Sequence, residues 1–179
     1  YDSPRPFRKN FEHEIIHNVR NLHGLILDIG CGSGFPSKFL SRKNKVIGID
    51  ISEGLIRKCK GNKNAIYLLA DASNLPFKTK IFDNVTMIGG VLNHVENFEK
   101  NINDVGRVLK KNGNFVFDVE NRKYRIKKIK RSKELYDTGY YEDIVDGKKI
   151  RFSQLFFDPI GLKFLLHRNG FGVKIKGSS

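Results

Sequence analysis

The sequence predicts an α/β fold with a doubly wound, mostly parallel sheet, helices on both faces and an antiparallel edge. Apolar runs typical of strands alternate with helical segments from residue 25 to residue 119, which favours parallel strands joined by right-handed crossovers. These strands are apolar along most of their length, as strands covered on both faces must be. The chain has 179 residues, the size of one domain, so residues 1–179 are expected to form a single unit.

Each element follows from periodicity and from the turn residues around it. The segment 8–22 carries apolar residues at helical spacing and ends at Gly24. The expected strands are 25–29, 45–50, 65–70, 84–88 and 114–119, and the expected helices between them are 35–42, 53–60 and 96–110. The connection from Asp71 to Asp83 contains Pro76, so little or no helix is expected there.

The last third of the chain departs from this alternation. Residues 144–157 predict one or two antiparallel strands around Asp146-Gly147. Asp158 is a suitable N-cap with Pro159 behind it, which predicts a helix to His167. A final strand is expected at 171–175. The antiparallel edge could be completed beyond this strand or by residues 144–157, and both readings stay open.

Composition indicates a soluble globular protein, with 39% hydrophobic and 29% charged residues. No apolar stretch reaches the length of a membrane span, and no signal-peptide pattern opens the chain. Two cysteines, Cys31 and Cys59, are too few for a disulfide framework and favour a reduced, cytoplasmic setting.

The formal net charge of +14 is unevenly distributed. Residues 121–133 hold eight basic side chains and no acid. Such a block is either a solvated surface segment or a patch for an anionic partner, namely RNA, anionic lipid or a phosphorylated substrate.

Three alternate glycines, Gly30, Gly32 and Gly34, lie between the first strand and the first crossover helix. Glycine lets the backbone approach a ligand closely, and the N–H groups of a helix start face that ligand. The third glycine arrives one residue earlier than in the dinucleotide-binding pattern G-x-G-x-x-G. The loop therefore predicts a nucleotide or cofactor site.

Further motifs flank this loop and occur along the chain in a recognisable order. They are Asp28 before the glycines, Asp50 after the second strand, Asp71-Ala72 after the third, Leu75-Pro76-Phe77, Phe82-Asp83, and Arg107–Lys110 with Gly113. With these motifs residues 22–119 resemble the class I S-adenosylmethionine (SAM) methyltransferases, in particular the type 11 small-molecule branch that includes the quinone-biosynthesis enzymes. The resemblance implies SAM as cofactor, S-adenosylhomocysteine as product, and in-line methyl transfer to a small-molecule acceptor.

The site residues lie at the carboxyl ends of the strands, where open α/β sheets bind ligands. Asp50 is placed to accept hydrogen bonds from the ribose hydroxyls. By resemblance, Asp71 and the Ala72 N–H face the adenine, and Ile51 is an apolar wall for it. Asp50 and Asp71 could instead cap turns, and Ile51 could belong to the core. The expected cofactor-binding set is Asp28, Gly30, Cys31, Gly32, Gly34, Asp50, Ile51, Asp71, Ala72 and Gly89.

Two residues after the fourth strand are candidates for catalysis. His94 matches a position where many relatives carry histidine and could act as general base, or it could cap or pack against the next helix. Asn93 could orient the substrate or the backbone. The basic and tyrosine-rich insertion at about 120–157 corresponds to the substrate lid of relatives.

One motif is rejected. Residues 13–17 read H-E-x-x-H, the pattern of a zinc protease. Only twelve residues precede it, and apolar Ile15 and Ile16 are explained as core positions, so no zinc is expected. An RNA methyltransferase that uses residues 121–133 and a non-catalytic SAM-binding module remain as alternative functions. The chain lacks the Asn-Pro-Pro-Tyr and Pro-Cys motifs that nucleobase methylation would favour.

Overall fold

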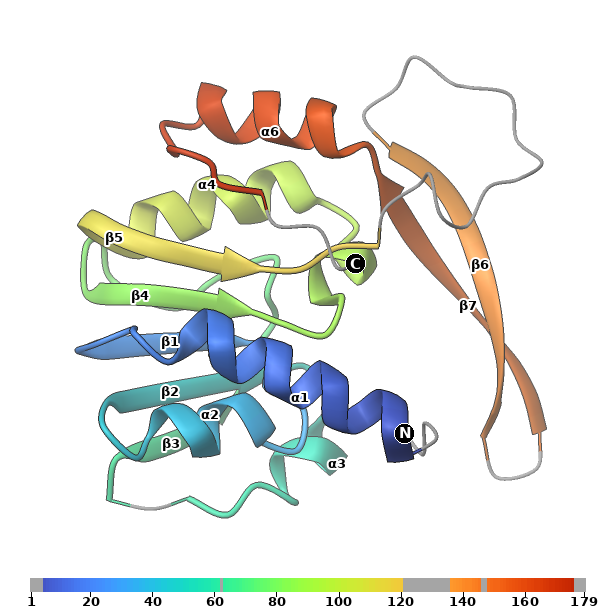
Figure 1. The fold of residues 1–179 in the computed structure, drawn as a ribbon, viewed down its shortest axis with the longest axis horizontal. Helices are drawn as coiled ribbons and strands as arrows, with labels where there is room; N and C mark the ends of the chain where they lie inside the picture. Colours follow the sequence, from blue (N-terminus) through green and yellow to red (C-terminus); the bar gives the residue numbers. More distant parts are fainter. Residues whose placement is uncertain (1–4, 62, 121–135, 146–147, 176–179) are drawn as a thin grey trace.

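The computed structural model describes residues 5–61, 63–120, 136–145 and 148–175 (Figure 1). Its centre is a parallel five-stranded sheet with the order β3-β2-β1-β4-β5. The strands are β1 (Leu25–Ile29), β2 (Lys45–Asp50), β3 (Ala65–Leu69), β4 (Phe82–Met87) and β5 (Leu109–Phe117). The order reverses at β1, so the sheet has a switch point between β1 and β4, as doubly wound folds do.

Helices pack against both faces of the sheet and enclose two cores. The described helices are α1 (Arg5–Val19), α2 (Phe35–Leu40), α3 (Glu53–Ile56), the 3₁₀ helix η1 (Val91–His94), α4 (Phe98–Val108) and α6 (Pro159–Arg168). Ile26 packs with α1 and α2 in one core, whereas its neighbour Leu27 packs with α4 and α6 in the other. This alternation is what a strand with two buried faces requires, and it confirms the predicted fold class for the parallel sheet.

Several element boundaries differ from the prediction. The helix expected over 96–110 begins only at Phe98, because Asn97 caps it by accepting a hydrogen bond from Lys100 N at 3.1 Å. The fifth strand starts at Leu109, five residues early, and its register with β4 shifts between Phe82 and Asn84. No helix forms between β3 and β4 in the described structure, as the sequence predicts.

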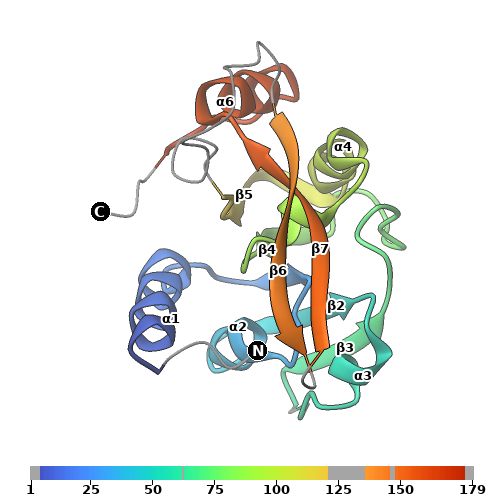
Figure 2. The same cartoon turned by 90° about the vertical axis from the view of Figure 1, so that its right-hand side faces the viewer.

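The antiparallel segment is a hairpin of two long strands. β6 (Tyr136–Val145) pairs with β7 (Lys148–Phe157) from Tyr136 opposite Phe157 to Val145 opposite Lys148. The hairpin stands beyond the carboxyl ends of the central strands (Figures 1 and 2). At its base, Tyr136 and Phe157 make edge contacts with Phe98 of α4, with ring centroids 5.2 and 5.1 Å apart. It forms a sheet of its own, so the antiparallel edge of the main sheet stays a prediction.

The chain closes with α6 and an extended tail. Asp158 caps the helix by accepting a hydrogen bond from Gly161 N at 2.9 Å, as predicted. Gly170 ends it with φ +82°. The strand predicted at 171–175 is wrong, since this segment pairs with no strand among the described residues. Phe171 and Val173 pack against the core instead, which explains their apolar spacing. No described helix has the length and apolarity needed to traverse a bilayer.

Candidate cofactor-binding site

The glycine loop joins β1 to α2 and presents bare backbone at the carboxyl edge of the sheet. Gly30 and Gly32 adopt φ +68° and +56°, a region that side-chain-bearing residues avoid. A Cβ on Gly30 would lie 2.4 Å from Val91 Cγ2, so this glycine permits close packing against η1. A Cβ on Gly32 would meet nothing within 4 Å, so this stretch of backbone faces open space. Of these two glycines, Gly32 therefore has room for a ligand and Gly30 does not.

Asp50 binds the glycine loop to the end of β2. Its Oδ2 accepts a hydrogen bond from Gly32 N at 2.9 Å, and its Oδ1 accepts one from Ser52 N at 2.8 Å. Each oxygen retains a lone pair, because an ionised carboxylate has about four acceptor sites. The half-buried carboxylate thus holds the loop and keeps the capacity to accept from a vicinal diol.

Asp28 lies beneath the loop and is only 1% exposed. Its oxygens accept hydrogen bonds from Ser37 Oγ at 2.5 Å and Thr86 Oγ1 at 2.8 Å. Burial raises the pKa of this carboxyl from 3.8 to about 6. The geometry makes Asp28 a clamp between β1, β4 and α2, which orients the helix start.

The ends of β2 and β3 carry exposed apolar side chains. Ile51 is 74% exposed and Leu69 is 57% exposed. Exposure of Ile51 argues against the core alternative for this residue. Asp71 and Ala72 follow β3, and Asp71 Oδ1 accepts a hydrogen bond from Ser73 N at 2.8 Å. Apolar side chains beside an exposed carboxylate suit a flat, hydrogen-bonding ring.

Asp118 is a site residue that the sequence analysis missed. It follows β5, and its carboxylate accepts hydrogen bonds from Gly89 N at 2.7 Å and Gly90 N at 3.2 Å. Burial raises the pKa of Asp118 above its ordinary value. Gly89 has φ +93° and open space where a Cβ would stand. The sequence pattern that could have indicated Asp118 is an acid directly after the fifth strand, because the carboxyl ends of parallel strands lie at one edge of the sheet.

Asn93 joins three segments near the end of β4. The side chain is 1% exposed, its Nδ2 donates to Leu155 O of β7, and its Oδ1 accepts from Glu120 N at 3.2 Å. These are the contacts expected of a residue that orients the backbone. His94 follows it at the end of η1 with an exposed side chain.

Cys31 contributes to the loop through its main chain. Its N–H donates to Ile49 O at 2.9 Å, which fixes the loop to β2, while its side chain is only 2% exposed. Gly34 begins α2 with φ +90°. A Cβ there would lie 3.0 Å from the Tyr67 hydroxyl, so this glycine accommodates a neighbour beneath the loop.

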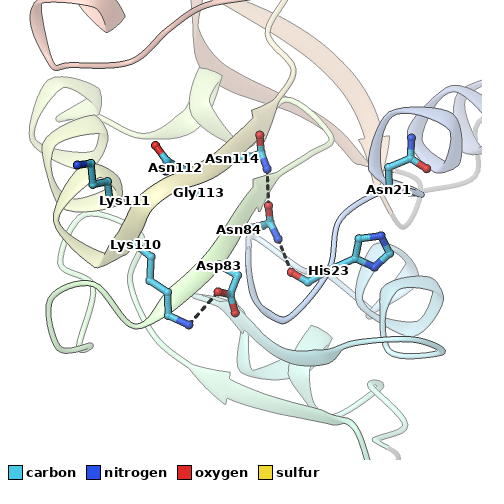
Figure 3. Close-up of a pocket in the computed structure, with 9 residues that line it drawn as sticks. All are labelled: Asn21, His23, Asp83, Asn84, Lys110, Lys111, Asn112, Gly113 and Asn114. Carbon is cyan, nitrogen blue, oxygen red and sulfur yellow. Dashed lines mark hydrogen bonds and ion pairs between the residues drawn. The ribbon is translucent and has the colours of Figure 1, made fainter.

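The opposite, amino end of the sheet also holds a polar pocket (Figure 3). Asn84 lies at its centre, accepting from Asn114 Nδ2 at 2.8 Å and donating to His23 O at 2.7 Å. The lining residues are Asn21, His23, Asp83, Asn84, Lys110, Lys111, Asn112, Gly113 and Asn114.

The H-E-x-x-H motif and the basic block are the remaining sequence features. Within the described part of the chain no three His, Cys, Asp or Glu side chains converge on a possible metal position, and this includes residues 13–17. The basic block 121–133 lies outside the described residues.

The carboxyl-end residues fit SAM as a group. Bare backbone at Gly32 and Gly89 gives room for a ligand at the ends of β1 and β4. On the β2–β3 side of Gly32, Asp50 offers acceptors for ribose hydroxyls, and Ile51 and Leu69 offer apolar surface for an adenine. These features are what a nucleoside-type cofactor requires at the carboxyl edge of a Rossmann-like sheet.

The chain matches a known protein family. A family model described as "Methyltransferase domain" matches residues 27–117, from within β1 to the end of β5. The chain belongs to this methyltransferase family and is a class I, Rossmann-like, SAM-dependent methyltransferase domain.

Three relatives show how far the similarity extends. The uncharacterized protein MJ1252 of Methanocaldococcus jannaschii is 34% identical over 173 residues, which cover 90% of this chain and 67% of that protein. A demethylmenaquinone methyltransferase of Symbiobacterium thermophilum is 36% identical over 102 residues, with coverages of 51% and 40%. The ubiquinone/menaquinone biosynthesis C-methyltransferase UbiE of Rickettsia typhi is 31% identical over 120 residues, with coverages of 59% and 48%. The chain thus spans less than half the length of the two named enzymes.

Solved structures show the same fold. The PH0226 protein of Pyrococcus horikoshii gives a TM-score of 0.70 at 23% identity, covering 93% of this chain and 83% of that one. A putative SAM-dependent methyltransferase of Listeria monocytogenes gives 0.70 at 17% identity, with coverages of 91% and 86%. Both alignments extend well beyond the matched family region.

Proposed function

We propose that this domain transfers a methyl group from SAM to a small-molecule acceptor. The proposal is carried by the open backbone of Gly32 and Gly89 on either side of the sheet's switch point, with the Asp50 carboxylate beside it. Relatives named as demethylmenaquinone methyltransferase and as a ubiquinone/menaquinone C-methyltransferase support a small, ring-bearing acceptor.

Bound SAM supplies a methyl group that its sulfonium already activates. The protein therefore has to align the acceptor and exclude water. Asp118 accepts hydrogen bonds from the N–H groups of the Gly89–Gly90 turn and so holds this bare backbone at the edge of the sheet. Asp50, Asp71, Ala72 and Ile51 are assigned to the adenosine part, and Gly30, Cys31, Gly32 and Gly34 to the methionine part through their main chain.

His94 is assigned as the general base when the acceptor must lose a proton. Its exposed side chain at the end of η1 follows directly on Asn93, whose buried amide fixes this segment against Leu155. The H94Q variant should lower kcat and change the pH profile of kcat while leaving SAM affinity unchanged. An unaltered profile would return His94 to a packing role.

Gln154 of β7 is assigned to acceptor binding. Its side chain is 4% exposed, and its Nε2 has no hydrogen-bond acceptor among the described residues. A buried donor without a partner is costly, so an oxygen of the acceptor would relieve it. The neighbouring Leu155 contacts η1 through Asn93, which brings β7 to this edge of the site. Q154L should raise KM for the acceptor and leave SAM affinity intact.

The direct test uses SAM with a radiolabelled methyl group and a cell extract. Label should appear in the small-molecule fraction, and a demethylated quinol should serve as a defined acceptor in a second assay. Label in RNA would replace this proposal with the alternative in which residues 121–133 grip phosphates. SAM binding without transfer to any fraction would leave a cofactor-binding module.

A further inference from the structure

The two cysteines of the chain lie side by side beneath the glycine loop. Cys59 Sγ donates a hydrogen bond to Gly32 O at 3.3 Å, and Cys31 Sγ lies 3.8 Å from the same oxygen. Both sulfurs thus share one carbonyl of the loop that faces the cofactor.

Both cysteines lie in connecting segments. Cys31 lies between Gly30 and Gly32 in the loop, and Cys59 follows the short helix α3, which ends at Ile56. Neither residue belongs to a strand or a helix, so bringing the sulfurs together would move loops and leave the sheet in place.

The two thiols differ in access. Cys31 is 2% exposed, whereas Cys59 is partly exposed. A reagent in solution therefore meets Cys59 first, and Cys31 is the internal thiol that can attack next. This is the arrangement of a peripheral and a resolving cysteine.

We propose that Cys31 and Cys59 form a reversible disulfide that distorts the glycine loop and weakens cofactor binding. The oxidant is a small disulfide of the glutathione type. Cys59 first attacks it, forming a mixed disulfide and releasing one thiol. Cys31 then attacks the Cys59 sulfur, forming the internal bond and releasing the second thiol. The two cysteines lose two electrons and two protons in total, and the small disulfide is reduced to two thiols.

The bond would act on the loop through Gly32. Disulfide sulfurs lie about 2.05 Å apart and carry no hydrogen, so Gly32 O would lose both thiol donors. Gly32 N is the donor to Asp50 at 2.9 Å, and a shift of this residue would disturb the carboxylate assigned to the ribose. This effect on affinity rests on the proposed cofactor site, whereas formation of the bond does not.

Burial raises the pKa of both thiols, so exchange should be slow near neutrality and accelerate as pH rises. Fully reduced protein is treated with excess glutathione disulfide at pH 7 and pH 9. The expected result is loss of both free thiols and a mass decrease of two hydrogens, faster at pH 9. Trypsin cleaves after Arg20, Lys38, Lys58 and Lys60, so the bridge would join peptide 21–38 to dipeptide 59–60.

SAM affinity is then measured by calorimetry before and after oxidation. Oxidised protein should bind about tenfold more weakly or worse, as loss of one hydrogen bond predicts, and dithiothreitol should restore binding. C59S is the matched control, because serine keeps a donor for Gly32 O and cannot cross-link. It should bind SAM like reduced wild type before and after the treatment.

The outcomes separate the two proposals. Glutathione retained on Cys59 with Cys31 still free, or two free thiols at pH 9, would overturn the disulfide. An internal disulfide with unchanged SAM affinity would overturn its effect on the loop. Failure of reduced wild type to bind SAM would instead count against the cofactor site, whatever the state of the thiols.

Discussion

The two ends of the parallel sheet are both rich in polar side chains, but these side chains have different partners. At the amino end, Asn84 bonds Asn114 Nδ2 at 2.8 Å and the His23 carbonyl at 2.7 Å (Figure 3). Asp83 bonds Leu25 N and Lys110 Nζ, both at 2.8 Å. At the carboxyl end, Asp50 and Asp118 accept from backbone N–H groups of glycines and turns, whereas the buried Asp28 accepts from two hydroxyls.

The difference distinguishes polar side chains that stabilise the fold from polar side chains that form a binding site. Side chains at the amino end bond one another and nearby backbone, and they connect β1, β4 and β5. At the carboxyl end, Asp50 and Asp118 hold the backbone of Gly32 and Gly89 beside open space. Polar side chains occur at both ends, so the informative property is glycine backbone held beside open space.

The largest expected effect concerns Asp28, the buried clamp of the carboxyl end. Its pKa rises from 3.8 to about 6 on folding, so between these values the native state binds more protons than the unfolded state. Stability from this group is therefore present below about pH 4 and is lost as pH rises to about 6, by up to about 3 kcal/mol. Urea unfolding of wild type and D28N across this range should differ by this slope. Parallel curves would contradict the raised pKa.

The Asp50 carboxylate should dominate cofactor affinity. D50A removes a charged acceptor and releases Gly32 N and Ser52 N, so SAM binding should weaken by about 2 kcal/mol or more. Calorimetry checks this. D83A, at the amino end, is the matched control and should leave SAM affinity unchanged. Equal affinity in D50A and wild type would remove Asp50 from the site.

At the amino end, Asn84 should affect stability alone. N84A deprives His23 O and Asn114 Nδ2 of their partner and should lower the free energy of unfolding by about 1–2 kcal/mol, with SAM affinity within about twofold of wild type. Denaturant titration and calorimetry measure both quantities. The exposed Asn103 of α4 provides a control, since N103A should change neither. A large loss of affinity in N84A would show that the two ends are coupled.

Two glycines allow backbone strain to be separated from ligand contact. Gly89 and Gly170 have φ +93° and +82°, and neither has an atom within 4 Å of an added Cβ. Alanine at either position should cost about 1 kcal/mol of stability, because the left-handed conformation is unfavourable for it. Only G89A should also weaken SAM binding. If G170A weakened it equally, strain and not contact would be the cause.

The smallest effect is expected for the exposed ion pair of Lys110 with Asp83. K110M should lower stability by less than about 1 kcal/mol, because water screens this pair and Asp83 retains Leu25 N. Thermal melts at low and high salt check this, since the difference from wild type should shrink as salt increases. A difference that persists at high salt would point to lost packing of the lysine stem.

Local sequence patterns predicted the parallel strands and the position of Asp50 because each strand and its turn lie within a few residues. Most of the missed features depend on distant partners. Asp118 meets Gly89, and Asn93 meets Leu155, only after folding. Residues 171–175 have the spacing of a strand, yet pairing requires a neighbour, and here Phe171 and Val173 bury themselves against the core. The Asn97 cap is a local exception: Asn97 accepts from Lys100 N, so the helix begins at Phe98 and not at residue 96.

The buried amide of Asn93 has a consequence for how such enzymes could diversify. One contact between the β6–β7 hairpin and the η1 segment is made by a main-chain carbonyl, that of Leu155, beside the ring contacts of Tyr136 and Phe157 with Phe98. A replacement hairpin of another sequence would keep this anchor as long as a carbonyl stood at the same point. Replacing the hairpin could then change which methyl acceptors are bound and leave the SAM-binding residues unchanged.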